Sequence, residues 1–575
     1  MKNSMTIGAL ALITLASVTP SPRRSSGIAP PADSVARARA LHVLNRLTYG
    51  PRPGDVDRVV AMGVDKFIDQ QLHPEQIPNK ALDQRLASYR VLTTSADEMA
   101  RTFAQVQRQQ QAQRRERGDS MRPPPPAPPD PAMIDNPQAQ QRLRQQAMNN
   151  PLRRLLGEYQ EATMDRAVMS ERQLYEVMVD FWTNHFNVFI GKGADRFLTP
   201  AYIEETIRPR AMGKFEDLLV ATAKSPAMLF YLDNAESVAP GSEPPQLARL
   251  RQMGGRRPGR FGLGFGMNPE RAESLRTRIE ERRPKGINEN YGRELMELHT
   301  LGVDGGYTQQ DVQNVARILT GWSIDQPRQR PDFVFNEWAH DYGTKVVLGQ
   351  RFPAEHGMDE GLALLHLLAH HPSTMRHVSA KLCARLVRDD PPDGCVDAGV
   401  HAWEKSDGDI REVVRAIVMS PDFWAPANRA AKVKTPLEFV VSAVRAVGAT
   451  PDTTPALAQL VARLGQPLFG QQPPTGYPET QESWVNSGAL LQRMNVALGI
   501  ASGRVPGALA NLDLVAPATA SGESLVAAVN RSVLNGAASE NTLRTLRDQT
   551  RDLPGDQARV MAIALALGSP EFQRQ

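Results

Sequence analysis

The sequence predicts a mainly α-helical protein: a multi-helical globular body with one small β-hairpin region and two disordered insertions. Apolar residues recur at spacings of three and four in residues 174–186, 362–368, 378–387 and 410–419, which is the period of a helix with one buried face. Strand-like alternation is scarce, and residues 333–349 are the one candidate hairpin. Two further stretches have a composition too biased for a packed core.

The amino terminus has the pattern of a signal peptide over residues 1–20. Lys2 is followed by an apolar and small-residue run over residues 5–18 and then by Thr-Pro-Ser-Pro. The run is shorter than the roughly 20 residues that span a bilayer, and no later segment approaches that length. We therefore expect a periplasmic or secreted protein with no transmembrane segment after signal removal. The alternative is the hydrophobic terminus of a cytosolic protein.

Residues 35–575 are expected to form a single large helical domain with insertions at about 105–150 and 240–285. The first insertion holds glutamine and arginine runs and the proline tract at residues 123–129. The second is rich in Arg, Gly and Pro. Its Gly-Leu-Gly-Phe-Gly at residues 262–266 resembles a phosphate loop only superficially, because no strand precedes it and no Lys-Ser/Thr follows.

Net charge argues against a nucleic-acid partner. The formal charge is only +4 over 575 residues, which is too small to provide the basic surface that binds a phosphate backbone. No nucleic-acid ligand is therefore expected.

Cys383 and Cys395 are the only cysteines in the sequence. An exported protein folds where thiols oxidise, so the two are expected to pair, and closing so short a loop would stabilise the fold by about 3 kcal/mol. The alternative is two reduced thiols, one on a helix and one in the following turn. Their spacing does not resemble a zinc or redox motif.

Residues 288–302 predict a helix with carboxylates set against its apolar face. At about 100° per residue, Asn290, Glu294 and Glu297 lie along one border of an apolar arc. The arc is formed by Tyr291, Leu295, Leu298 and Leu301. A carboxylate at the edge of a core must be paired, hydrogen-bonded, metal-bound or protonated. We therefore expect this helix to make specific polar contacts.

His185 lies near the centre of an apolar helix face that includes Phe181 and Trp182. A histidine in such a position is a core residue with both ring nitrogens satisfied, a metal ligand, or an acid–base group. The sequence leaves these three roles open.

His340 and Asp341 crowd a turn before a strand, with Lys345 close behind them. Adjacent His and Asp on a loop can orient a catalytic imidazole or bind a cation. Alternatively, Asp341 caps the turn and Lys345 lies in solvent.

Two other patterns could bind metal. His366 and His370 are four residues apart and can reach one ion, but no HExxH pattern is present and His-His-Pro closes the helix, so we interpret them as a surface helix end. Glu294 and Glu297 resemble half of a carboxylate-bridged dimetal site, but the second half, usually another Glu-x-x-His, is missing.

Several motifs in fixed order resemble a bacterial family known only as domain of unknown function 1800. These motifs occupy residues 45–51, 181–186, 289–303, 307–312, 340–345, 371–374, 381–386, 420–423 and 476–479, with Trp484. The resemblance covers about residues 38–575. It implies a secreted, mostly helical protein, often encoded beside a secreted protein with a sulfatase-like fold, and it implies no established reaction.

Two functions are compatible with these observations. The favoured one is an envelope or extracellular binding and assembly protein that acts with the co-encoded sulfatase-like partner, because no complete catalytic signature is present. The alternative is an exported hydrolase or metal-dependent enzyme whose site gathers His185, Glu294, Glu297, His340 and Asp341 in an open cleft. The sequence requires no cofactor, and a divalent cation is possible.

Overall fold

Helices begin at side chains that accept hydrogen bonds from the first free backbone N–H groups. Asn150 accepts two such bonds at the start of its helix, and Thr308 and Thr435 each form a capping box with the acidic residue three positions later. Ser420 and Ser569 cap two short helices whose first residue is proline. These caps determine the residues at which successive helices begin.

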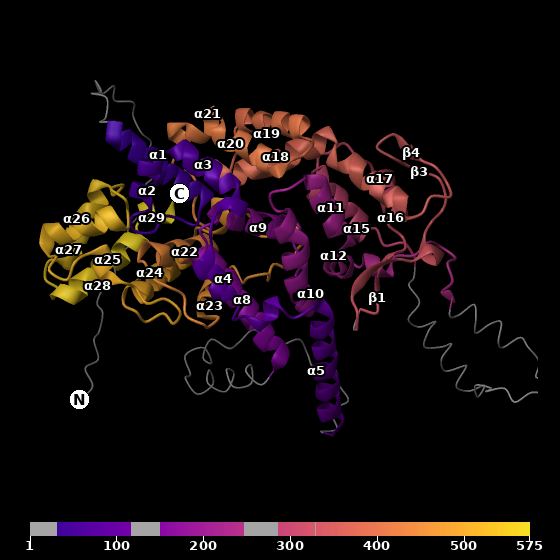
Figure 1. Ribbon diagram of the computed structural model, residues 1–575, viewed down its shortest axis with the longest axis horizontal. Helices are drawn as coiled ribbons and strands as arrows, with labels where there is room; N and C mark the ends of the chain where they lie inside the picture. The colour runs from indigo at the N-terminus through magenta and orange to yellow at the C-terminus, as the bar shows by residue number, and fades with distance from the viewer. Residues whose placement is uncertain (1–31, 117–149, 246–285, 328) are drawn as a thin grey trace, which may run out of the picture.

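The computed structural model describes residues 32–116, 150–245, 286–327 and 329–575, and its architecture is mainly α-helical (Figure 1). The helices before the first strand are α1 (Ala32–Leu47), α2 (Asp55–Met62), α3 (Val64–Leu72), α4 (Lys80–Leu86), α5 (Ala96–Glu116), α8 (Pro151–Met169), α9 (Gln173–His185), α10 (Asp195–Ala201), α11 (Phe215–Lys224), α12 (Pro226–Tyr231), α15 (Asn290–Glu294) and α16 (Gln309–Ile318). Those after the last strand are α17 (Met358–Ala369), α18 (Pro372–Leu386), α19 (Asp393–Ser406), α20 (Ile410–Met419), α21 (Pro421–Trp424), α22 (Pro436–Ala446), α23 (Ala456–Arg463), α24 (Ser487–Ala501), α25 (Leu512–Val515), α26 (Gly522–Ser532), α27 (Glu540–Thr550), α28 (Gly555–Gly568) and α29 (Pro570–Gln573).

The predicted signal peptide lies outside the described residues. So do residues 117–149 and 246–285, which make up most of the two predicted insertions. The start of the first insertion is described, and there α5 continues as a helix through the glutamine-rich run to Glu116. No helix in the described part of the chain combines the length and apolarity needed to cross a bilayer.

The predicted strands at residues 333–335 and 345–348 exist, but they do not pair with each other. β2 (Asp332–Phe335) pairs antiparallel with β1 (Trp322–Asp325), and β3 (Lys345–Val347) pairs antiparallel with β4 (Gln350–Phe352). The single predicted hairpin was therefore wrong in its pairing. A tight turn explains the second pair, because Leu348 and Gly349 both have positive φ angles of 51° and 80°, as a two-residue hairpin turn requires.

Buried apolar side chains form two core clusters. The first lies among α1, α9, α11 and α15 to α20, and the second lies among α22, α24 and α26 to α28. Helix α22 is buried along its whole length and contacts both α8 and α24. In Figure 1 it lies between the C-terminal helices at one end of the molecule and α9 near its centre. Polar groups at the start of α22 therefore lie where the two core clusters meet.

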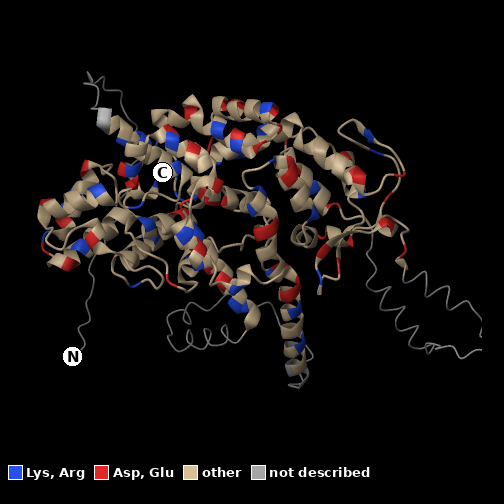
Figure 2. Ribbon diagram, viewed as in Figure 1, with Lys and Arg blue, Asp and Glu red and all other residues tan. Residues whose placement is uncertain are grey.

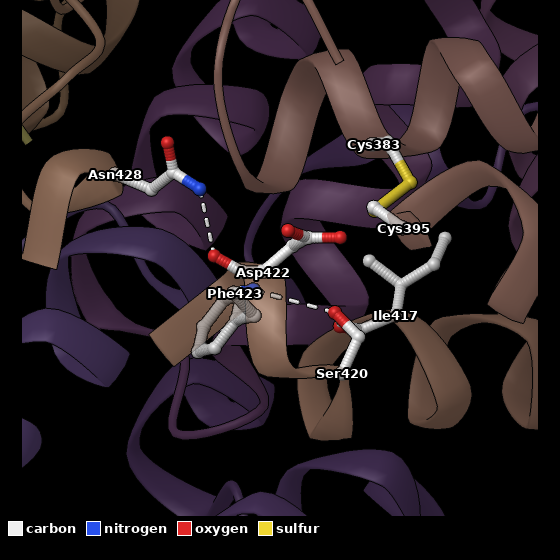
Figure 3. The surroundings of a disulfide bond; sticks show 7 residues. All are labelled: Cys383, Cys395, Ile417, Ser420, Asp422, Phe423 and Asn428. Carbon is white, nitrogen blue, oxygen red and sulfur yellow. Dashed lines mark hydrogen bonds between the residues drawn. A yellow bond between two sulfur atoms is a disulfide. The ribbon is translucent and has the colours of Figure 1, made fainter. Parts of the chain in front are cut away.

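A disulfide joins Cys383 of α18 to Cys395 of α19, with the two Cα atoms 6.2 Å apart (Figure 3). The favoured pairing of the cysteines is therefore present. Cys395 lies in the first turn of α19 and not in the preceding turn. Nearby, the Ser420 hydroxyl accepts the Phe423 N–H at 3.3 Å and fixes the start of α21. The bridge holds α18, which carries a central residue of the site described below.

Charged side chains are spread over the fold. Figure 2 shows Lys and Arg interspersed with Asp and Glu along the described helices. This mixture agrees with the small net charge of +4.

Candidate functional site

His185 ends α9 in the first core cluster, where its side chain is 2 % exposed. Its Nε2 lies 3.1 Å from the carbonyl oxygen of His299, so the predicted His185 helix does contact the helix at residues 288–302. Its Nδ1 is buried without a hydrogen-bond partner among the described residues. Burial, reinforced by the positive charge of Lys381, lowers the pKa of His185 well below its usual value. The imidazole is therefore neutral.

The segment at residues 288–302 is not one regular α-helix. α15 ends at Glu294, and a π-helical turn follows over Leu295–Thr300. Because that turn advances each residue by less than 100°, it buries His299 and leaves Leu298 at the edge of the core. The predicted apolar arc was correct for its other three members, which are buried: Tyr291, Leu295 and Leu301.

Glu294 and Glu297 are both partly buried, as predicted for the border of the apolar face. Partial burial and the charge of Glu297 raise the pKa of Glu294. The Tyr307 hydroxyl donates to Glu297 at 3.4 Å. Arg293 does not neutralise Glu294 by contact, because its guanidinium lies 3.6 Å from Glu289 instead.

His340 and Asp341 lie in a separate polar cluster around β3. The His340 ring contacts the Thr320 carbonyl at 2.8 Å and the Glu360 carboxylate at 3.2 Å. Asp341 accepts hydrogen bonds from the Arg317 guanidinium at 2.9 and 3.1 Å, which lower its pKa against the opposing effect of burial.

Among the described residues, no hydrogen bond, ion pair or ring contact joins this cluster to His185, Glu294 or Glu297. The contacts thus divide the five predicted site residues into two groups. A functional role for either group stays a prediction.

A different set of residues surrounds a cavity between the two core clusters, which we call the motif pocket. Its volume is about 80 Å³, room for several water molecules. It is lined by side chains from the turn after α1, α8, α9, the segment at residues 203–208, α18, the start of α22 and the loop at residues 466–479, including Tyr49, Tyr159, Arg166, Glu176, Asp180, Thr183, Asn184, Arg208, Arg385, Thr435, Phe469, Tyr477 and Glu479. Four of the family motifs, at residues 45–51, 181–186, 381–386 and 476–479, contribute to this lining.

Arg385 is the centre of the charged wall of the motif pocket. Its side chain is only 4 % exposed and contacts three carboxylates. Nη2 lies 3.1 Å from Asp180 and 3.3 Å from Glu438, and Nη1 lies 3.2 Å from Glu479. These groups come from α9, α18, α22 and the loop that follows α23. The buried arginine therefore ties the two core clusters together.

Asn184 holds the Gly476–Glu479 loop against α9. Its Nδ2 donates to the Tyr477 carbonyl at 2.8 Å, and its Oδ1 accepts the Tyr477 N–H at 2.6 Å. Gly476 has a φ of +73°, and a Cβ there would lie 2.3 Å from the Asn184 carbonyl oxygen. Only glycine fits this close approach, which brings Glu479 to Arg385.

Two further arginines line the motif pocket, and each forms an ion pair with a glutamate. Arg208 donates to both oxygens of Glu176 at 2.9 Å, and Arg166 donates to both oxygens of Glu204 at 2.6 and 2.9 Å. Fork-to-fork pairs of this kind fix both side chains in one orientation. Arg166 and Arg208 are therefore held in place by their glutamates.

The pKa of Asp180 lies close enough to neutrality for proton transfer in the motif pocket. Burial raises the pKa of Asp180 to about 6, with Arg385 opposing the shift and Glu479 and Glu438 adding to it. A carboxyl that titrates near neutrality can bind a ligand hydroxyl in either protonation state and can exchange a proton with it.

Sequence reasoning missed Asp180, Arg385 and Glu479 as site residues. A signal was present, because Arg385 and Glu479 lie within the motifs at residues 381–386 and 476–479 and Asp180 immediately precedes the motif at 181–186. Nothing in the chain order shows that these segments meet, since they are separated by long helical stretches.

The fold and the site define a mainly helical protein whose two core clusters meet at a charged pocket. The chain belongs to the family described as "Protein of unknown function (DUF1800)", whose model matches residues 42–574. The family resemblance predicted from the motifs is thereby confirmed. No curated protein and no solved structure matches the chain.

Proposed function

We propose that this chain is an exported binding protein that takes a small, neutral, hydroxyl-bearing group, such as the end of a sugar chain, into the motif pocket. The observation that carries the proposal is that four family motifs, distant in sequence, meet around this one cavity. A purely structural role would not require an open cavity at their meeting point.

The charges of the motif pocket favour a neutral ligand. The lining holds three arginines and three carboxylates, and every one of them has an ionic partner. A charged ligand would have to break one of these pairs, and leaving a buried charge unpaired costs about 3–5 kcal/mol. A hydroxyl can instead use the remaining lone pairs of Asp180 and the side chains of Thr183 and Thr435.

Aromatic rings in the lining supply the apolar surface that such a ligand needs. Tyr159, Phe469 and Tyr477 all line the cavity, and the rings of Tyr159 and Phe469 have centroids 5.5 Å apart. The C–H face of a sugar ring packs well on such side chains, while its hydroxyl groups meet the polar wall.

Export and partnership belong to the same proposal. The apolar run at residues 5–18 supports a signal peptide, and the Cys383–Cys395 bridge suits an oxidising compartment. The partner is the co-encoded secreted protein with a sulfatase-like fold that the family resemblance implies. Co-purification of the two from the periplasm or medium tests the partnership, and no enrichment over an unrelated exported bait counts against it.

A second candidate function is hydrolysis at the same pocket. Asp180, with its pKa raised to about 6, and Glu479 both line the cavity and contact the same guanidinium. Two carboxyl groups in unlike environments are the arrangement that general acid–base catalysis uses. In this case Asp180 donates the proton and Glu479 activates water. The metal-dependent alternative, with His185, Glu294, Glu297, His340 and Asp341, stays a prediction.

A binding screen with a matched pair of variants separates these functions. The full chain is tested against a panel of neutral oligosaccharides by thermal shift and calorimetry, together with Asp180→Asn and the surface variant Glu523→Gln. We expect one class of sugar to raise the melting temperature of the wild type and of Glu523→Gln but not of Asp180→Asn. Release of new reducing ends from the bound sugar identifies hydrolysis. Equal responses of both variants would refute the assignment of the pocket.

A further inference from the structure

A cluster of two histidines and one glutamate lies on the surface, outside the motif pocket. His366 lies in the last turn of α17, His370 follows that helix, and Glu216 lies in the first turn of α11. One ligand atom from each lies within 4.8 Å of the other two. The sequence alone could pair the histidines, but the third residue is supplied by a helix 150 residues earlier.

The distances within this cluster fit a tetrahedral metal. The His366 Nδ1 lies 3.1 Å from both oxygens of Glu216, and the His370 Nδ1 lies 3.8 Å from one of them. Nitrogen and oxygen ligands placed about 2.0–2.1 Å from a zinc ion at tetrahedral angles lie about 3.3 Å apart. The two observed separations fall on either side of that value. Small side-chain rotations would therefore complete the geometry.

Asp407 completes the surroundings of the cluster. Its Oδ1 lies 2.8 Å from the His370 Nε2, on the opposite side of that ring from the Nδ1. A carboxylate that accepts a proton from one ring nitrogen lets the other serve as the metal ligand, and this is the usual support of a metal-bound histidine. The Nδ1 lies 2.9 Å from the His366 carbonyl oxygen, and metal binding would replace that contact. The other oxygen of Asp407 accepts a bond from Lys214 at 3.2 Å, which holds the carboxylate in place.

We propose that Glu216, His366 and His370 bind a divalent transition metal of the zinc class, with Asp407 as the orienting residue for His370. Two imidazoles among three ligands select zinc, cobalt, nickel or copper over magnesium and calcium, which prefer oxygen. The His366 side chain is 64 % exposed, so the fourth position opens to water. Binding would fasten α11 to α17 and to His370 directly after it.

The competing occupant of the cluster is a proton. Against the opposing effect of partial burial, the hydrogen bonds to Asp407 and the His366 carbonyl raise the pKa of His370. A protonated ring would form ion pairs with the same two carboxylates and would need no metal. Metal binding must then weaken as the pH falls, because the ligands have to lose their protons first.

Titration of the full, tag-free chain with Zn²⁺ after treatment with a chelator tests the proposal, with Co²⁺ as a spectroscopic probe of tetrahedral geometry. We expect one equivalent to bind at pH 7.5. The affinity should fall at least about tenfold in His366→Ala and in Glu216→Gln, and by about tenfold in Asp407→Asn. His401→Ala, which removes another exposed histidine, should bind like the wild type.

A second measurement guards against loss of fold in the variants. Zinc should raise the melting temperature of the wild type and of His401→Ala but not that of His366→Ala, while the metal-free circular dichroism spectra stay the same. Unchanged zinc affinity in both His366→Ala and Glu216→Gln would overturn the site. So would the absence of stoichiometric binding to the wild type.

Discussion

Asp180 and Glu438 contact the same guanidinium nitrogen, Nη2 of Arg385, at 3.1 and 3.3 Å, yet their pKa values move in opposite directions. Burial raises the pKa of Asp180 to about 6. Burial opposes the shift of Glu438, but Arg385, the Thr435 N–H and the Gln575 amide lower its pKa to about 2. The difference is that Glu438 accepts hydrogen bonds from neighbouring groups on both oxygens. Glu438 anchors the arginine, and Asp180 remains free to titrate.

These opposite shifts predict opposite pH dependences of stability. The folded state holds the Asp180 proton more tightly than the unfolded chain does, so the stabilisation from this group is complete below pH 3.8 and is lost as the pH rises through about 6. The stabilisation from Glu438 is complete above pH 4.5 and is lost as the pH falls towards about 2.

Urea unfolding of the wild type, Asp180→Asn and Glu438→Gln between pH 3 and 7 checks this prediction. The free energy of unfolding of the wild type minus that of Asp180→Asn should decrease with rising pH. The corresponding difference for Glu438→Gln should increase in the lower half of the range. Parallel curves for the two variants would contradict the assignment.

Loss of the Arg385 charge should destabilise the fold severely. Arg385→Met leaves three carboxylates without their common cation, and breaking a buried network in this way costs about 3–5 kcal/mol of unfolding free energy. Arg376→Met is the matched control on the same helix, because Arg376 is 56 % exposed and pairs only with surface carboxylates. An exposed pair contributes about 0–1 kcal/mol. Chemical denaturation measures the free energy of unfolding of both variants. Equal losses in the two variants would show that Arg385 does not hold the buried carboxylates together.

Alanine substitutions at two glycines test whether the close approach of the Gly476–Glu479 loop to α9 is required. Gly476→Ala adds a methyl group that would overlap the Asn184 carbonyl, at a φ of +73°. Gly465→Ala has a similarly unfavourable φ of +102° but opens to free space. In both variants the alanine has to adopt a left-handed conformation, which costs about 1 kcal/mol. Any further loss of stability in Gly476→Ala therefore measures the steric contact. We expect a larger fall in melting temperature and loss of ligand binding only for Gly476→Ala.

Reduction of the disulfide should destabilise the fold and loosen α18, the helix that carries Arg385. The Cys383–Cys395 bridge joins residues 12 positions apart in sequence. Losing a cross-link that closes a loop of this size lowers the free energy of unfolding by about 3 kcal/mol. The double variant Cys383→Ala/Cys395→Ala should therefore unfold at lower urea concentration than the oxidised wild type. Dithiothreitol should lower the stability of the wild type and leave that of the double variant unchanged.

The helical class of the fold could be predicted because long amphipathic segments are a local property of the sequence. The helices around His185 and at residues 410–419 follow directly from the spacing of their apolar residues. The strand pairing at residues 322–352 could not be predicted in this way, because Phe333 and Lys345 find partners outside the segment between them. The π-helical turn at Leu295–Thr300 also has no distinct local signature.

The site was harder to predict, for a physical reason. His185 and Glu294 could be predicted as candidates because a titratable side chain on the apolar face of a helix breaks the local hydrophobic pattern. Arg385 lies on a helix of mixed composition, and Glu479 lies in a loop, so neither stands out. Their importance comes from long-range ion pairs that join segments up to 299 residues apart in sequence, between Asp180 and Glu479 by way of Arg385.

The meeting of the two core clusters at Arg385 also decides how the chain can be divided. The segment between α21 and α22 looks like a natural place to cut, since the first core cluster ends before it and most of the second lies after it. The second cluster nevertheless takes several buried side chains from before the cut: Tyr49, Met164, Ala167, Val168 and Val177. Such a cut would leave Arg385 with Asp180 on one fragment and would place Glu438 and Glu479 on the other without the arginine that they share. The two halves are therefore not independent modules, and the chain has to be expressed as one piece.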